Sequence, residues 1–306
     1  YTKLATFTSS MRNIIMKALN DVAFDLDLLK KHQSESVFAK SLLGSVSLSV
    51  IRGQFNRVLN GDIALTPFDF SYNFQPNAKS KTYALTFDVK AGSSPSTNIH
   101  AIIGRNGVGK TTLLNGMIQS ITNSERNQGF VDCNGKSIRR DYFSSLVSIS
   151  FSAFDAYSPP IEQPDPLKGT CYFYIGLQAR KEQQRLKDRS QLDTELVEAF
   201  LVCVAEREKK KRLFDAIETL ESDENFYQLN LSELKDVAKS NAKRLVWEKM
   251  QVMSSGHAIV FLSIVKLVAH VEEKTLVLID EPESHLHPPL LSAFIRALSE
   301  LLMKRN

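Results

Sequence analysis

A glycine-rich segment between an apolar run and an amphipathic run constrains the fold of this 306-residue chain more than any other feature. The segment reads Gly-Arg-Asn-Gly-Val-Gly-Lys-Thr-Thr over residues 104–112 and fits the pattern G-x-x-x-x-G-K-[ST] in full. Asn98–Ile103 before it predicts a short apolar strand, and Thr111–Ile121 after it predicts a helix with one apolar face. A strand, a glycine loop and a helix in this order indicate an α/β fold.

The residues of this loop are those that phosphate binding requires. Glycines let backbone N–H groups approach phosphate oxygens without a Cβ clash, and the N-terminus of the following helix adds N–H groups and its dipole. Lys110 is predicted to contact the β- and γ-phosphates of ATP and so to act in catalysis, and the Thr111 hydroxyl is predicted to ligate Mg²⁺. The predicted ATP-binding residues here are Gly104, Arg105, Asn106, Gly107, Val108, Gly109, Lys110, Thr111 and Thr112.

A second apolar run, followed by two acids, predicts the metal-binding and water-activating groups. Thr275–Ile279 is typical of a parallel strand buried on both faces, and Asp280 and Glu281 follow it. Carboxylates at that end of a strand fall beside the phosphates, because open α/β sheets bind ligands there. Asp280 is predicted to hold Mg²⁺, and Glu281 is predicted to orient and deprotonate the attacking water.

The composition is that of an ordinary globular protein. Hydrophobic residues make up 43% of the chain and charged residues 24%, which argues against disorder. The net charge of +4 permits contact with nucleic acid without requiring it. No apolar run reaches the length of a membrane span, and the three cysteines lack disulfide or zinc spacing, so we expect a cytoplasmic protein without membrane contact.

The patterns divide the chain into three predicted parts. Residues 1–177 form an N-terminal lobe with the glycine loop, 178–250 a helical insertion, and 251–306 a C-terminal lobe. Acidic and basic residues nearly balance in the insertion, which favours a solvated face over a DNA-binding patch. Because the chain starts at Tyr1 and stops just after a strongly patterned helix, we expect it to lack its extreme termini.

A pentapeptide ahead of the acids carries a family resemblance. Met-Ser-Ser-Gly-His at 253–257 resembles the L-S-G-G-Q signature of ABC ATPases. The resemblance implies an α/β fold of the P-loop NTPase class and ABC-ATPase type, with a mixed β-sheet core flanked by helices and a helical insertion. It also implies that two copies dimerise around ATP, each completing the other's site. The residues that would bind the partner's γ-phosphate are Ser254, Ser255, Gly256 and His257.

The run Asp-Glu-Pro-Glu-Ser-His-Leu-His-Pro at 280–288 resembles OLD-like and related AAA-type ABC ATPases, which act on or alongside nucleic acid. His285 and His287 have a metal-like spacing, but we interpret them as shaping a loop that contacts the dimer partner. Residues 151–155 occupy the place of the family's Q-loop and contain no glutamine, so Ser152 or a water is predicted to complete the Mg²⁺ shell. The family's switch histidine is not present in the chain.

Over most of its length the chain resembles the ATPase subunit of Septu-type antiphage systems, also found beside some retrons. That resemblance implies that the nucleotide state regulates a partner HNH nuclease in antiphage defence. A retron reverse transcriptase and its DNA or RNA are further partners that it implies. Two other functions stay open, a DNA-repair or recombination ATPase that clamps DNA and a nucleotide-binding scaffold with little turnover. A transporter subunit is disfavoured by the long insertion and the absent Q-loop glutamine.

Overall fold

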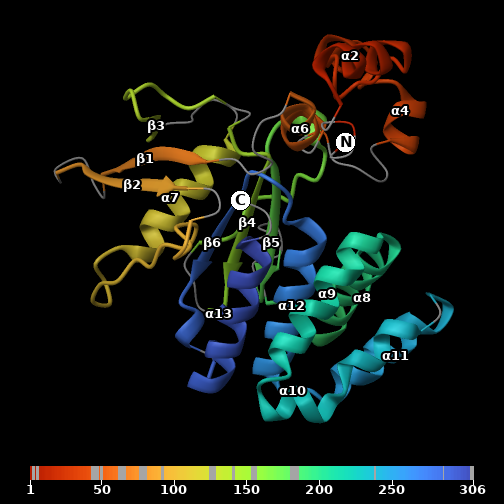
Figure 1. Ribbon diagram of the computed structural model, residues 1–306. Coiled ribbons are helices and arrows are strands. Elements are labelled where there is room, and N and C mark those ends of the chain that lie inside the picture. Colours follow the sequence, from red (N-terminus) through yellow and green to blue (C-terminus); the bar gives the residue numbers. More distant parts are fainter. Residues whose placement is uncertain are drawn as a thin grey trace.

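A computed structural model describes most of the chain, namely residues 1, 4, 7–42, 48, 51–60, 67–75, 81–90, 93–123, 129–139, 142–152, 157–179, 186–237, 239–284 and 286–303. Its strands form two three-stranded sheets, one antiparallel and one parallel, with helices packed against both (Figure 1). The α/β class predicted from the sequence is confirmed. The predicted mixed sheet is divided, among the described residues, into these two separate sheets.

The parallel sheet is built from β4 (Ser145–Ser150), β5 (Cys171–Gly176) and β6 (Thr275–Asp280), in the order β5-β4-β6. Five of the six residues of the central strand β4 are buried, as expected for a strand covered on both faces. Ser150 pairs with both Gly176 and Asp280, so the three strands end at the same edge. The strand predicted from the apolar run before the two acids is therefore confirmed, but its predicted burial on both faces was wrong. Only Leu278 of β6 is buried, because the strand borders a cavity.

The antiparallel sheet consists of β2 (Tyr83–Val89), β1 (Phe68–Phe74) and β3 (Phe130–Asp132). Helix α7 (Lys110–Thr122) packs between this sheet and the parallel one. Its buried side chains share a core with aromatic residues of β1 and with residues of β4, β5 and β6. This packing holds the start of α7 near the carboxyl end of β6.

Helices cover the other face of the parallel sheet (Figure 1). Helix α12 (Ser255–His270) is buried at every position from 257 to 269, and α13 (Pro288–Met303) lies against it. The helices between β5 and α12 are α8 (Arg189–Ala205), α9 (Arg207–Leu220), α10 (Glu224–Leu229), the 3-10 turn η3 (Leu231–Asp236) and α11 (Lys239–Val252). These helices share one hydrophobic core with α12 and α13.

The first 60 residues contribute short helices with a small core of their own. They are α2 (Ser9–Ala18), α3 (Leu26–His32), α4 (Ser36–Ser41), the π-helix η1 (Ile51–Phe55) and α6 (Asn56–Asn60). The remaining short turns are η2 (Pro166–Lys168) and η4 (Pro282–Ser284). None of the helices in the described ranges is long and apolar enough to cross a membrane.

The strand predicted at Asn98–Ile103 is not present, and this prediction was wrong. The segment is irregular, and Ile103 is 93% exposed. Residues 98–104 and β6 both line a cavity of about 590 Å³. A strand needs a backbone neighbour at about 4.8 Å to pair its polar groups, and Asn98–Ile103 pairs with no described strand.

Candidate functional site

The glycine loop turns sharply into α7. Gly107 and Gly109 have φ angles of +81° and +98°, which side chains rarely tolerate. Gly109 is the N-cap residue, and no side chain from it caps the helix. The N–H groups of the first turn of α7 are therefore available to an anion, which is the property that phosphate binding uses. The loop residues 104–108 are exposed.

Lys110 curls back over this loop. Its ammonium Nζ donates a hydrogen bond to the Gly104 carbonyl oxygen at 2.9 Å. Lys110, Thr111 and Thr112 are all partly exposed on the first turn of α7. The lysine charge, the threonine hydroxyls and the uncapped helix N-terminus form a donor set that fits a nucleotide phosphate chain with its Mg²⁺.

The two acids follow the carboxyl end of β6, as predicted. Asp280 is the last residue of the strand, and Glu281 has a φ of +46°, in the left-handed region that residues other than glycine seldom adopt. Ser284 donates to the Glu281 carbonyl oxygen from both its N–H, at 3.1 Å, and its hydroxyl, at 2.9 Å. A strained backbone that is held in this way is typical of functional positions.

One cavity brings the loop and the acids together. Gly104, Asn106 and Lys110 line it beside Asp280 and Glu281. Most of the remaining lining is apolar, and its largest contributions come from residues 98–103 and from β6. A few polar groups in a mostly hydrophobic cavity are the usual composition of a ligand site.

A small pocket of about 30 Å³ also contains Asp280, together with Ser150 and Gln178. The predicted Mg²⁺ ligand Ser152 is not among the described residues that line this pocket, and its role stays a prediction. We assigned Gln178 no role from the sequence. Its position two residues after β5, at the edge where the parallel strands end, is the signal that could have identified it.

The signature-like segment begins α12. Ser254 is the exposed N-cap residue, and its Oγ accepts a hydrogen bond from the His257 backbone N–H at 3.4 Å. Ser254 Oγ also lies 2.6 Å from His257 Nδ1. Ser254, Ser255, Gly256 and His257 do not line the cavity of the glycine loop within the described part of the chain. Their predicted contact with ATP therefore depends on a second copy.

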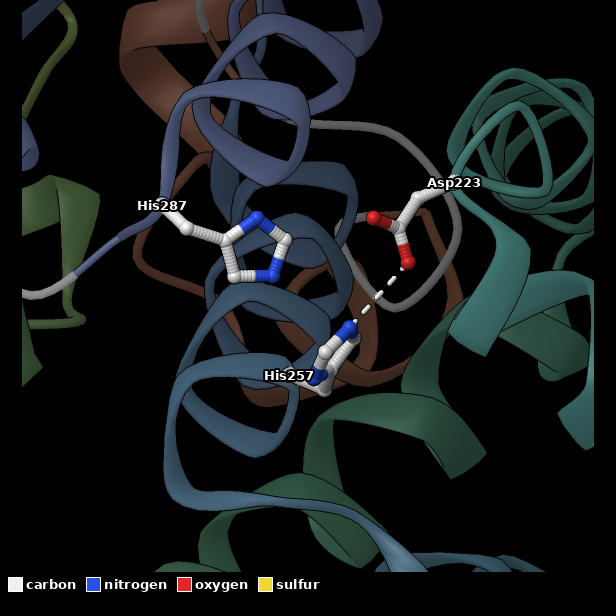
Figure 2. Close-up of side chains that lie close together, drawn as sticks. All are labelled: Asp223, His257 and His287. Atoms are coloured by element: carbon white, nitrogen blue, oxygen red, sulfur yellow. Dashed lines mark hydrogen bonds and ion pairs between the residues drawn. The ribbon is translucent and has the colours of Figure 1, made fainter.

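The imidazole of His257 points into the protein rather than toward a ligand surface. It is 6% exposed, and its Nε2 lies 3.1 Å from Asp223 Oδ1. The His287 side chain approaches the same pair from the loop before α13 (Figure 2). His287 Nδ1 accepts a hydrogen bond from the Leu290 N–H at 3.4 Å. His285 lies outside the described residues.

The comparisons with known proteins bear on the carboxyl-terminal part most directly. Residues 175–305 match the family described as an AAA domain, putative AbiEii toxin, type IV toxin–antitoxin system. The match includes Asp280, Glu281 and the signature-like segment, and it starts after the glycine loop. No solved structure matches the chain.

The chain is also 45% identical to Protein ea59 of Escherichia phage lambda over 327 aligned residues. The alignment covers the whole chain and 62% of the phage protein, so the chain spans less than two thirds of this relative. From the end of β5 to α13, the chain is therefore similar to AAA-family domains, and this similarity supports a P-loop ATPase.

Proposed function

We propose that the protein binds Mg-ATP in the loop at 104–112 and hydrolyses it at an interface with a second copy of itself. The observation that supports this function best is the shared cavity, in which Lys110 and the loop backbone meet Asp280 and Glu281. These residues lie on elements that are distant in sequence. Their convergence supplies the phosphate, metal and water contacts that hydrolysis of a phosphoanhydride needs.

Each side chain has a distinct part in this proposal. Lys110 leaves the Gly104 carbonyl and binds the β- and γ-phosphates, while Thr111 and Asp280 hold Mg²⁺. The metal, when bound, neutralises charge on the phosphate oxygens. Glu281 accepts a proton from the attacking water, since its carboxylate is the acidic group nearest the strand end after Asp280.

The proposal includes a second copy because the signature-like segment does not line the cavity of its own chain. Ser254 is exposed at the N-terminus of a 16-residue helix, where backbone N–H groups and the helix dipole favour an anion. Across a two-fold axis, Ser254 of each copy would face the γ-phosphate held by the other. Each dimer then has two composite sites.

Phosphate release and molecular mass, measured on the purified chain, test this function together. With Mg-ATP we expect steady phosphate release and a doubled mass in light scattering, while with ADP we expect the single-chain mass. ATP binding without release would favour the scaffold function instead. An absence of nucleotide binding would reject the site itself.

The further step, taken from the family resemblance, is that nucleotide state regulates a partner nuclease. The support is limited to that resemblance, and the phage relative adds none for a defence role. Affinity purification from the native host tests the step. A nuclease recovered in a near-equal amount, with or without a reverse transcriptase, would support it. ATP-dependent DNA binding that weakens steeply with salt, in the absence of a nuclease, would favour the DNA clamp.

A further inference from the structure

Three side chains from separate parts of the chain converge beside the start of α12 (Figure 2). Asp223 precedes α10, His257 lies in the first turn of α12, and His287 precedes α13. Each offers one nitrogen or oxygen atom, and these atoms all lie within 4.8 Å of one another. Asp223 and His257 are both buried, and His287 is exposed.

We propose that Asp223, His257 and His287 bind a divalent transition-metal ion of the zinc class. Two imidazoles and one carboxylate are a ligand set that such ions favour, and three protein ligands leave a fourth position for water. The exposed side chain of His287 gives an ion a path from solvent to the two buried ligands. In a tetrahedral site with ligand distances near 2.0–2.2 Å the ligand atoms lie roughly 3.4 Å from one another, so atoms that now lie within 4.8 Å would move closer together on binding.

The surrounding hydrogen bonds orient each of the three side chains so that one of its atoms can coordinate an ion. His257 Nδ1 faces the Ser254 hydroxyl, and His287 Nδ1 accepts the N–H of Leu290, so Nε2 of each ring is the atom left to coordinate. Asp223 Oδ1 accepts the N–H groups of residues 225 and 226 at the start of α10, which fixes the carboxylate and leaves Oδ2 to the ion. Such second contacts orient the ligands of metal sites.

The ion would also change what Ser254 presents. Without metal, Asp223 Oδ1 accepts a hydrogen bond from the protonated His257 Nε2, so the unprotonated Nδ1 accepts a hydrogen bond from the Ser254 hydroxyl. With metal on Nε2, the proton moves to Nδ1, which then donates to Ser254 Oγ and frees the hydroxyl to donate elsewhere. Metal binding at this site would thus change how the Ser254 hydroxyl contacts the γ-phosphate of the partner's ATP. Only that link depends on the proposed function of Ser254; the metal site does not.

The test is a titration of the full, nucleotide-free chain with Zn²⁺ in competition with a chromophoric chelator. We expect one tightly bound ion per chain, and Co²⁺ in its place should give the visible absorption of a four-coordinate site. Asp223→Asn keeps an oxygen to cap α10, and His287→Asn keeps a cap for α13. Each substitution removes one ligand, so the affinity should fall at least about 10-fold.

His32→Gln is the matched control. His32 is distant in sequence from the three ligands, and its Nδ1 lies 2.6 Å from a Glu35 carboxylate oxygen. The substitution should leave zinc affinity unchanged. Wild-type affinity in both ligand variants, or loss of binding only in the control, would overturn the proposal. If Asp223→Asn does not fold, the exposed His287→Asn decides alone. Since no nucleotide is present, failure here leaves the ATPase proposal intact, and failure of ATP hydrolysis leaves this result intact.

Discussion

The ammonium group of Lys110 donates to the Gly104 carbonyl at 2.9 Å in an exposed part of the loop, a contact it can exchange for phosphate. Lys110→Ala should therefore weaken Mg-ATP binding about 10–100-fold, the range expected when a charged hydrogen bond of about 1.5–3 kcal/mol is lost. Calorimetric titration measures the change. Lys136→Ala, an exposed lysine in the turn after β3, is the control and should bind normally. Equal affinity in the Lys110 variant would remove the lysine from the site.

Glu281 allows catalysis and backbone strain to be separated at one position. Glu281→Gln keeps the side-chain volume and the φ of +46° but cannot accept the proton, so hydrolysis should fall about 100-fold or more while ATP binding persists. Glu281→Gly removes the same group and also relieves the left-handed backbone, so it should raise the unfolding free energy by about 1 kcal/mol. Single-turnover phosphate release and chemical denaturation measure the two effects. Turnover at the wild-type rate in the glutamine variant would assign the base to another residue.

At this scale the sequence predicted the donors and acids because their motifs are local. The partner of His257 could not be predicted in this way. Asp223 lies 34 residues earlier, in a segment whose charge pattern indicated only a solvated face. At this pair the Phe226 ring of α10 lies 5.1 Å from the His257 ring, a tertiary contact that no local spacing encodes.

At the scale of the elements, the contact between β5 and α12 predicts how the stability of the fold depends on pH. His270, the last residue of α12, stacks on Phe173 of β5 with 3.8 Å between ring centroids. Burial, helped by the positive charges of Lys266 and Lys209, lowers the pKa of His270 to about 3. The unfolded chain has an ordinary histidine pKa near 6.5. Between these values the unfolded state binds the extra proton, so His270 makes the fold less stable as pH falls below about 6.5.

His270→Phe keeps the ring stacking and removes the titration. The wild type should lose up to about 1.4 kcal/mol of unfolding free energy per pH unit more than this variant between pH 6 and 4. Urea unfolding at a series of pH values measures the difference. His32→Gln removes a surface histidine instead and should follow the wild-type curve. Parallel curves for the wild type and His270→Phe would show that His270 titrates normally in the folded protein.

The elements also show where pattern reasoning stops. The apolar run at Thr275–Ile279 predicted β6, which pairs with β4 along its whole length. The same kind of run at Asn98–Ile103 forms no strand, because strand formation depends on a paired neighbour and not on hydrophobicity alone. Periodicity predicts which side chains are buried, whereas the topology determines which backbone segments pair as strands.

At the scale of the whole molecule, the separation of the glycine loop from Ser254 predicts that two inactive variants can restore each other. Lys110→Ala disables the phosphate loop, and Ser254→Arg blocks the partner's γ-phosphate by bulk. In a mixed dimer one composite site carries both defects and the other carries neither. With equal mixing, half of the dimers are mixed and half of their sites are intact, so about a quarter of wild-type phosphate release should return.

Each variant alone has a defect in both sites of its dimer, and so should be nearly inactive. The control mixture combines Lys110→Ala with Glu281→Gln, whose side chains line the same cavity within one chain. Every site in that mixture contains at least one defect, and no activity should return. Recovery in the first mixture alone would demonstrate a site shared between copies. Full activity of Ser254→Arg alone would place the whole ATPase site within a single chain, and equal recovery in both mixtures would show that Lys110 and Glu281 of one site come from different copies.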